Sequence, residues 1–329
     1  MAAQRTVIVG AGIVGLSTAW YLARAGHQVT VIDRDPVGDG ASCGNAGLLS
    51  IGHYPLTRPG VSWRGIKWMF DRNAPLFIRP RADASLLGWL WDFHRHCNQR
   101  WLDGCMKSLC EMGFPTLAIF EEMIAAEGID CDYRRDGWLD VVMLPENMPH
   151  AEAEAKALVP HGYSYKVLTG KELRERSPCF ADEVAGAVWY TDSAHCHPGD
   201  FMRGLVRACE RHGVRMLVGE EAVAIARDRA GRASGVVLGS GGTVEGDHVV
   251  IAAGVWSDAL GRSVGLDIPM QGARGYHLQY EGIPQLPFTG CVLHETFVAV
   301  TPMRDQLRLA DRKSTRLNSS HANISYAVF

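Results

Sequence analysis

A glycine-rich turn near the amino terminus constrains the fold of this chain more than any other feature. Gly10, Gly12 and Gly15 follow directly after the strand-like residues 6–9 and precede apolar residues at helical spacing. A second apolar run ends at Asp33, about 20 positions beyond Gly12. A buried strand, a Gly-x-Gly-x-x-Gly turn, a helix and a second strand that ends in an acid predict a β-α-β unit that binds a dinucleotide.

The three glycines have separate predicted tasks in such a unit. Gly10 permits the tight turn, Gly12 lets the backbone approach a pyrophosphate, and Gly15 allows the helix to pack closely on the strand. We expect the pyrophosphate at the positive, amide-bearing end of the helix. Asp33 is expected to accept hydrogen bonds from ribose hydroxyls and to repel a 2′-phosphate, which disfavours NADP. NAD and FAD remain alternatives on this motif alone.

Size and charge narrow the class of protein. With 329 residues, 47% of them hydrophobic, the chain exceeds what one compact core usually holds, so we expect two interlocked domains with a cleft between them. A net charge of −3 offers no field to attract nucleic acid, and we expect no such partner. The nine cysteines match no zinc-ligand spacing and indicate reduced thiols. We see no export signal and no membrane-spanning segment, and we therefore expect a cytoplasmic protein.

The spacing of apolar residues predicts the main helices. Residues 83–127 are expected to be helical, with a break near Gly113 and Pro115. A further helix is expected over residues 198–212, after a turn at residues 195–197. That turn reads His-Cys-His, but without a second ligand cluster we expect no metal there.

Strand patterns follow in the second half of the chain. We expect strands in quick succession at residues 214–217, 222–226, 234–238 and 244–252. Residues 275–280 and 296–301 also have strand patterns, which we expect to remain outside a complete sheet.

Two further segments of small residues indicate a particular family. Residues 41–47, called the small-residue loop below, read Ala-Ser-Cys-Gly-Asn-Ala-Gly, and residues 249–257 form a strand that ends in Ala-Ala-Gly. Together with residues 197–205 and 274–277, these segments resemble the D-amino acid oxidase-type flavoproteins and, within them, the D-amino acid dehydrogenases. The resemblance covers residues 4–310 and favours FAD over NAD.

The resemblance implies an α/β fold with a Rossmann-like FAD-binding domain on a parallel sheet. This domain is interlocked with an α+β substrate domain on a mixed or antiparallel sheet. Residues 1–80 and 197–262 would form the FAD-binding domain, and residues 81–196 and 263–310 a helical segment and an incomplete substrate domain. The residues implied to bind FAD are Gly10, Gly12, Ile13, Val14, Gly15, Asp33, Arg34, Ser42, Asn45, Ala46, Gly47, Val223, Ala253 and Gly254.

The resemblance also implies oxidation of D-amino acids. A hydride would leave the substrate Cα for flavin N5, water would hydrolyse the imine to a 2-oxo acid, and the electrons would pass to a quinone or another respiratory acceptor. Such chemistry needs a carboxylate anchor more than acid–base residues. Arg274 and Tyr276 project to one face of a predicted strand and are candidates, with an ordinary surface arginine as the alternative. His53 is a third candidate, unless it is simply solvated, and we assign no catalytic base.

Other functions remain open at this point. The same scaffold supports oxidation of glycine, sarcosine or hydroxyproline, and a flavin-carrying subunit or an inactive truncated fragment are further alternatives. Between residues 63 and 101, basic residues alternate with aromatic ones. This segment could touch the inner face of the plasma membrane peripherally, or form a solvated face over buried aromatic rings.

Residues 311–329 differ in character from the rest of the chain. They show no helical or strand period, and they closely resemble the translation of a short-read sequencing adapter, with a genuine serine-rich flexible tail as the alternative. One reading frame of the adapter gives residues 311–321, a short index gives the next two, and the following adapter stretch gives residues 324–329. We therefore expect a non-native segment without regular structure, and a gene that continues differently after Ala310.

Overall fold

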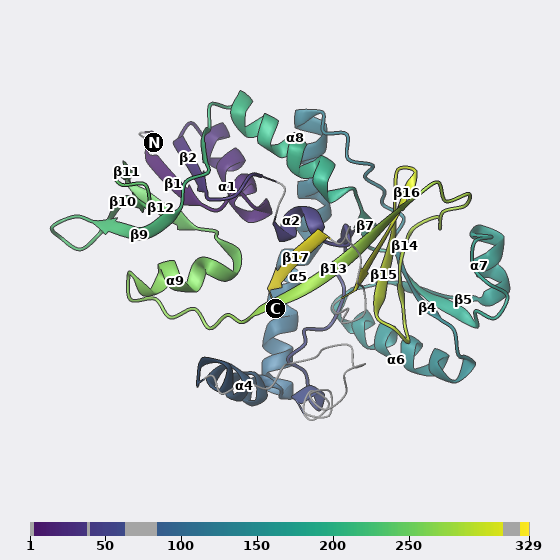
Figure 1. The fold of residues 1–329 in the computed structure, drawn as a ribbon. Helices are drawn as coiled ribbons and strands as arrows, with labels where there is room; N and C mark the ends of the chain where they lie inside the picture. The colour runs from purple at the N-terminus through teal and green to yellow at the C-terminus, as the bar shows by residue number, and fades with distance from the viewer. Residues whose placement is uncertain (1–2, 38–39, 63–83, 312–322, 329) are drawn as a thin grey trace.

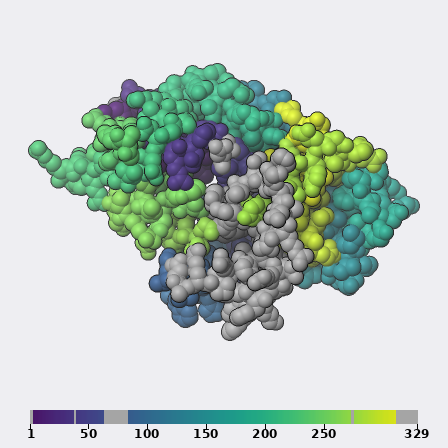
Figure 2. Space-filling view, viewed as in Figure 1, coloured from purple at the N-terminus to yellow at the C-terminus, as the bar shows by residue number. Residues whose placement is uncertain are grey.

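The computed structural model describes residues 3–37, 40–62, 84–311 and 323–328. A small parallel sheet with α-helices lies at one end of the molecule, and a large mixed sheet lies at the other (Figure 1). This arrangement confirms the predicted α/β fold with a Rossmann-like sheet and a mixed sheet. The space-filling view shows purple amino-terminal residues at the surface, between teal and green residues and the lime and yellow residues of the large sheet (Figure 2).

The parallel sheet contains the predicted β-α-β unit. Its four strands run in the order β12-β1-β2-β8, with β12 at His248–Ile251, β1 at Arg5–Val9, β2 at Gln28–Asp33 and β8 at Arg215–Val218. Helix α1 (Ile13–Arg24) connects β1 to β2, and α8 (Pro198–Arg211) precedes β8. Ile8, Leu16 and Val31 are buried with Phe201 of α8 in one hydrophobic core. Burial of these apolar side chains is what holds both helices on the sheet.

The large sheet has eight strands in the order β17-β13-β16-β15-β14-β4-β6-β5, and β14 and β4 are its one parallel pair. The strands are β4 (Trp138–Val142), β5 (Tyr165–Thr169), β6 (Gly186–Tyr190), β13 (Gly272–Glu281), β14 (Gly290–Leu293), β15 (Val298–Met303), β16 (Gln306–Asp311) and β17 (Asn323–Val328). The expectation that β13 and β15 remain outside a complete sheet is therefore wrong. Their sheet is completed by β4 to β6, which end at Tyr190, far before β13 begins at Gly272, and leave no local signal near β13 and β15.

Two short sheets and several connecting elements complete the fold. The small sheets are β11-β10-β9 and β3-β7, with β9 at Ala222–Arg227, β10 at Ala233–Leu238, β11 at Thr243–Glu245, β3 at Leu48–Leu49 and β7 at Ala194–His195. The connecting elements include α2 (Ala41–Gly44), α6 (Met148–Leu158), α7 (Gly170–Arg176), α9 (Ser257–Arg262) and the 3₁₀ turns η1 (Pro145–Asn147), η2 (Val159–His161) and η3 (Gly254–Trp256). The strand expected over residues 244–252 is thus divided between two sheets. His195 belongs to β7 rather than to a turn, whereas His197 caps α8 as its side chain accepts from the backbone of Asp200.

The long helical segment ends and restarts at a different place from the one predicted. Helix α4 (Ala84–His96) ends before Asn98, whose side chain accepts a hydrogen bond from the backbone of Trp101 and begins α5 (Gln99–Glu127). Helix α5 then runs unbroken through Gly113 and Pro115. Burial of Met106, Leu117 and Met123 on both sides of the proline offsets the hydrogen bond that proline cannot donate.

Residues 323–328 form a strand, contrary to our expectation. Their backbone pairs antiparallel with β13, in the register that places Gly275 opposite Ser325. A strand of almost any sequence can satisfy the backbone groups at a sheet edge, because the bonds are made by the main chain. Strand β17 also contacts α2 and η3.

Candidate functional site

The turn between β1 and α1 has the geometry that the glycine motif predicts. Gly10 has a φ of +112°, and a Cβ at this position would lie 2.2 Å from the carbonyl oxygen of Ala252. A Cβ at Gly15 would lie 1.9 Å from the carbonyl oxygen of Gly10. Gly12 is the N-cap of α1 and carries no capping side chain, and Val14 in the first turn is exposed. Apart from the amide of Ile13, which donates to Ser42 Oγ, the amide end of α1 is therefore accessible to a ligand phosphate.

Asp33 holds this turn in place. One of its carboxylate oxygens accepts a hydrogen bond from the backbone of Ala11 at 2.7 Å, and the other accepts from the backbone of Asp35 at 3.0 Å. Each oxygen keeps a second lone pair, so the carboxylate can still accept from ribose hydroxyls. Its predicted role in ribose binding stays a prediction.

The small-residue loop is fixed to the start of α1 and is rigid in itself. Ser42 Oγ accepts a hydrogen bond from the backbone of Ile13 at 2.9 Å. Asn45 donates to the carbonyl oxygens of Ala41 and Ser42 and accepts from the backbone of Gly47 at 2.8 Å, so its side chain ties the loop across its neighbour Ala46. The loop is therefore preorganised beside the dinucleotide turn, where the resemblance predicts the flavin.

The remaining predicted cofactor residues come from three places. Ala253 adjoins the turn, since a Cβ at Gly10 would lie 3.1 Å from its Cα. Gly254 begins η3 with a φ of +54°. The Arg34 guanidinium lies 4.2 Å from the ring centroid of Trp256 in η3, so the end of β2 and η3 flank the same side of the turn. Val223 is half exposed on β9, in the three-stranded sheet.

The predicted substrate residues occupy different surroundings. Tyr276 lies half-buried on β13, and the side chain of Arg274 lies outside the described residues. Strand alternation places Tyr276 on the face of β13 opposite His277 and Gln279. His53 is exposed, with Nδ1 3.5 Å from Ser50 Oγ. Their contact with a substrate stays a prediction.

Arg308 on β16 is a site residue that our sequence reasoning missed. Its guanidinium donates to the carbonyl oxygens of Cys43 and Asn45 at 3.0 and 2.8 Å, and to the side-chain oxygen of Gln279 at 3.3 and 2.9 Å. It is only 5% exposed, and burial lowers the pKa of its guanidinium. Arg308 stands between two leucines in a strand, a pattern that predicts a solvent-facing side chain.

Buried polar atoms without a partner surround the small-residue loop. Within the described residues they include His277 Nδ1 and Thr301 Oγ1, which lie on strands next to Arg308, and His195 Nε2, opposite Leu48. Burial lowers the pKa of His195 to about 4, and burial together with the nearby Arg308 charge lowers the pKa of His277, so both rings are neutral at pH 7. An unsatisfied buried polar group costs about 1–3 kcal/mol. These atoms therefore fit a polar ligand such as a flavin beside the loop.

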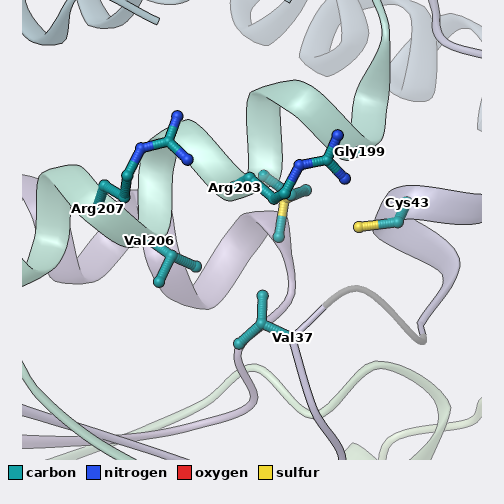
Figure 3. A pocket seen from close by; sticks show the side chains of 7 residues that line it. Val37, Cys43, Gly199, Arg203, Val206 and Arg207 are labelled. Atoms are coloured by element: carbon teal, nitrogen blue, oxygen red, sulfur yellow. The ribbon is translucent and has the colours of Figure 1, made fainter.

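A cavity of about 340 Å³ lies between α8 and the side chains of Val37 and Cys43 (Figure 3). Arg203 and Arg207 of α8 border it, and Arg203 is paired with Asp200. Of the cofactor-binding residues implied above, none lines this cavity. We therefore place the candidate cofactor site at the turn and the loop rather than in this cavity.

Of the basic and aromatic stretch at residues 63–101, residues 63–83 lie outside the described residues, and the membrane contact of the stretch stays a prediction. Among the helices of the described ranges, none is long and apolar enough to cross a bilayer. In the same ranges, no group of three or more potential ligand side chains is arranged to hold a metal ion.

Comparison with known proteins identifies relatives of this chain. Residues 5–324 match the family of FAD-dependent oxidoreductases called DAO. The D-amino acid dehydrogenase of Methylobacterium nodulans is 34% identical over 322 residues, which cover 93% of this chain and 74% of that protein. The D-amino acid dehydrogenase of Helicobacter pylori is 30% identical over 319 residues, with coverage of 96% and 76%. Glycine oxidase from Bacillus cereus has the same fold, with a TM-score of 0.68 at 19% identity over 99% of this chain and 71% of that one.

Proposed function

This chain belongs to the DAO family of FAD-dependent oxidoreductases, and from this membership we propose that it oxidises D-amino acids to 2-oxo acids. Relatives at 30–34% identity over most of the chain are named D-amino acid dehydrogenases, which favours this substrate class over glycine, sarcosine or hydroxyproline. The similarity to glycine oxidase concerns the fold alone.

One structural observation carries the proposal. The small-residue loop is bonded on one side to the start of α1 through Ser42, and on the other side to the large sheet through Arg308. A ligand held at the amide end of α1 would therefore extend along the loop toward the sheet, which is the placement that a dinucleotide with a reactive ring requires.

Bound FAD would accept a hydride from the substrate Cα. The chain would hold the pyrophosphate with the backbone amides at the start of α1, and the loop would fix the reactive ring. We propose that Arg274 and Tyr276 anchor the substrate carboxylate and that His53 lies near the ring. The imine product needs only water for hydrolysis, so no residue is assigned as an acid or a base.

We propose a quinone or another respiratory component as the electron acceptor, with peripheral contact at the inner face of the plasma membrane. Helix α4 offers a surface for such contact. Leu87 and Trp91, one helical turn apart, are 61% and 62% exposed, and the last turn of the helix carries His94 and Arg95. An apolar stripe beside basic residues suits the surface of an anionic bilayer.

Turnover with the two enantiomers tests the proposal. We expect the FAD-loaded protein to convert D-alanine to pyruvate with a soluble quinone as acceptor, and L-alanine at least about a hundredfold more slowly. Hydrogen peroxide as the main reduced product would identify an oxidase and contradict the proposed acceptor. Turnover of glycine or sarcosine alone would contradict the proposed substrate class. Protein that binds FAD yet oxidises no amine would favour a flavin-carrying subunit or an inactive fragment.

A further inference from the structure

Arg308 is a buried cation without a carboxylate partner among the described residues. Its four hydrogen bonds go to backbone carbonyl oxygens and to the neutral amide of Gln279. The neighbouring Arg304, in contrast, is paired with the carboxylates of Asp130 and Asp200. An isolated buried charge is costly, so a cation in this position calls for an anion that arrives with a ligand or with the reaction.

The hydrogen bonds that Arg308 already makes exclude bidentate binding of a substrate carboxylate. A guanidinium has five N–H groups. Both N–H groups of Nη1 are directed at Cys43 and Asn45, and Nε and one N–H of Nη2 are directed at Gln279, so one N–H remains. A bidentate grip on a substrate carboxylate needs two parallel N–H groups. Arg308 therefore cannot act as such an anchor without releasing the loop or Gln279.

We propose that Arg308 sets the reduction potential of the bound FAD, by placing an uncompensated positive charge behind the small-residue loop. This inference rests on the FAD binding of the proposed function and goes beyond it. Arg308 is a positioning and electrostatic residue here, since its contacts are with the loop.

The reason is a change of charge during the reaction. Hydride transfer delivers two electrons and one proton, so an uncharged oxidised flavin ring acquires one negative charge. Burial and the nearby Arg308 charge lower the pKa of both His277 and His197, so these two rings are neutral at pH 7 and do not contribute a charge of their own. A charge with little solvent contact acts over several ångströms with weak screening, so Arg308 stabilises the reduced ring relative to the oxidised one.

Sulfite is the probe for this charge, because it adds to an oxidised flavin and leaves the ring negative. The experiment uses the full chain loaded with FAD and measures the dissociation constant of sulfite and the two-electron potential. The main variant is Gln279→Glu, which keeps the guanidinium and its geometry but places a carboxylate against it. The matched control is Gln306→Glu, which makes the same change on a half-buried neighbour whose side chain contacts Gln279 and Glu281 but not the guanidinium.

We expect Gln279→Glu to weaken sulfite binding about tenfold and to lower the potential by about 30 mV, the equivalent of a tenfold change for two electrons. Gln306→Glu should change sulfite binding less than about threefold, since its charge does not contact the guanidinium. Arg308→Met should weaken sulfite binding at least as much as Gln279→Glu. Arg308→Lys should keep sulfite binding near that of the wild type while FAD dissociates faster, because the charge remains and the loop bonds are lost.

Equal sulfite binding and equal potentials in wild type, Gln279→Glu and Gln306→Glu would overturn the inference and leave the proposed function standing. Weaker D-amino acid binding in Arg308→Met with unchanged sulfite binding would also overturn it, in favour of a carboxylate anchor. If the Arg308→Met variant does not fold, the sulfite binding and the potential of the Gln279→Glu variant test the inference on their own. Sulfite binding that depends on Arg308 in a protein that no amine reduces would support the inference and overturn the proposed function. A wild-type chain that takes up no FAD would overturn both.

Discussion

At the scale of single residues, three donors from two helices converge on the carboxylate of Glu127 at the end of α5. Trp20 Nε1 of α1 lies 2.7 Å from it, and Arg211 and His212 at the end of α8 lie at 2.6 and 2.7 Å. Burial alone would raise the pKa of Glu127, but these hydrogen bonds and the charges of their donors outweigh it and hold the pKa at about 2. The Glu127 carboxylate thus connects α5 to α1 and to the end of α8, the two helices that pack on the parallel sheet.

Replacement of Glu127 by Gln should therefore lower the free energy of unfolding by about 2–3 kcal/mol at pH 7. Because the folded pKa lies below the unfolded value of 4.5, this contribution is present above pH 4.5 and is lost as the pH falls toward about 2. Urea titrations at pH 7, 5 and 4 check both points. The control Glu122→Gln on the same helix removes an exposed pair with Arg24 and should cost less than about 0.5 kcal/mol. A difference between wild type and Glu127→Gln that grows as the pH falls would contradict this account.

His294 gives the opposite pH dependence. Its Nδ1 lies 2.9 Å from an oxygen of the buried Asp140, and this hydrogen bond raises the pKa of His294 against the effect of its own burial. The hydrogen bond between His294 and Asp140 therefore stabilises the folded state fully below the unfolded pKa of 6.5. This contribution to the free energy of unfolding is lost as the pH rises through the folded pKa of His294. We expect His294→Asn to cost about 1 kcal/mol more at pH 6 than at pH 9 in urea titrations. A cost that is larger at pH 9 would exclude this pairing.

At the scale of elements, local sequence patterns were sufficient to predict a helix or strand where the elements that pack on it are close in sequence. The unit β1-α1-β2 follows from its own residues, because turn, helix and strand pack on one another. The position of Arg308, in contrast, depends on β13 pairing with β16 and on the small-residue loop far away in the chain. The break predicted at Pro115 failed because burial of α5 is a tertiary effect that a local breaker signal does not include.

Helix α4 allows a test of the proposed membrane contact. We expect the full chain to co-sediment with vesicles that contain anionic lipid, and the double variant Leu87→Ser, Trp91→Ser to lose at least about half of the bound fraction. Val159→Ser, Leu266→Ser, which also removes two exposed apolar side chains but from different surfaces, should sediment like the wild type. Equal sedimentation of all three proteins would rule out α4 as the contact.

At the scale of the whole molecule, the small-residue loop links the parallel part of the fold to the large mixed sheet at the candidate site. Strand β13 follows α9 directly and enters the large sheet, while Arg308 of β16 reaches the small-residue loop (Figure 1). We propose that the division into an FAD-binding part and a substrate part follows these sheets. The glycine motif identified the dinucleotide turn and the resemblance identified the fold, whereas the buried polar atoms near the loop depend on tertiary packing and have no sequence signature.

The origin of residues 311–329 leads to a prediction about FAD binding by the whole molecule. We propose that they come from a sequencing adapter, and we expect the gene amplified from source DNA to continue differently after Ala310. Since β17 contacts both α2 and η3, the two segments beside the proposed flavin site, we further expect the product of the amplified gene to bind FAD more tightly than the present chain. Fluorescence titration with FAD measures the difference. Recovery of residues 311–329 in frame from source DNA would contradict the proposal.

The visible spectrum of the FAD-loaded protein under anaerobic conditions tests the central claim most directly. The protein produced from the amplified gene is mixed with D-alanine, and separately with L-alanine, and the oxidised flavin band is followed over time. We expect D-alanine to bleach the band within the mixing and turnover period and L-alanine to leave it unchanged. A yellow protein whose band no D-amino acid bleaches would contradict the proposed function and leave only the fold and the cofactor.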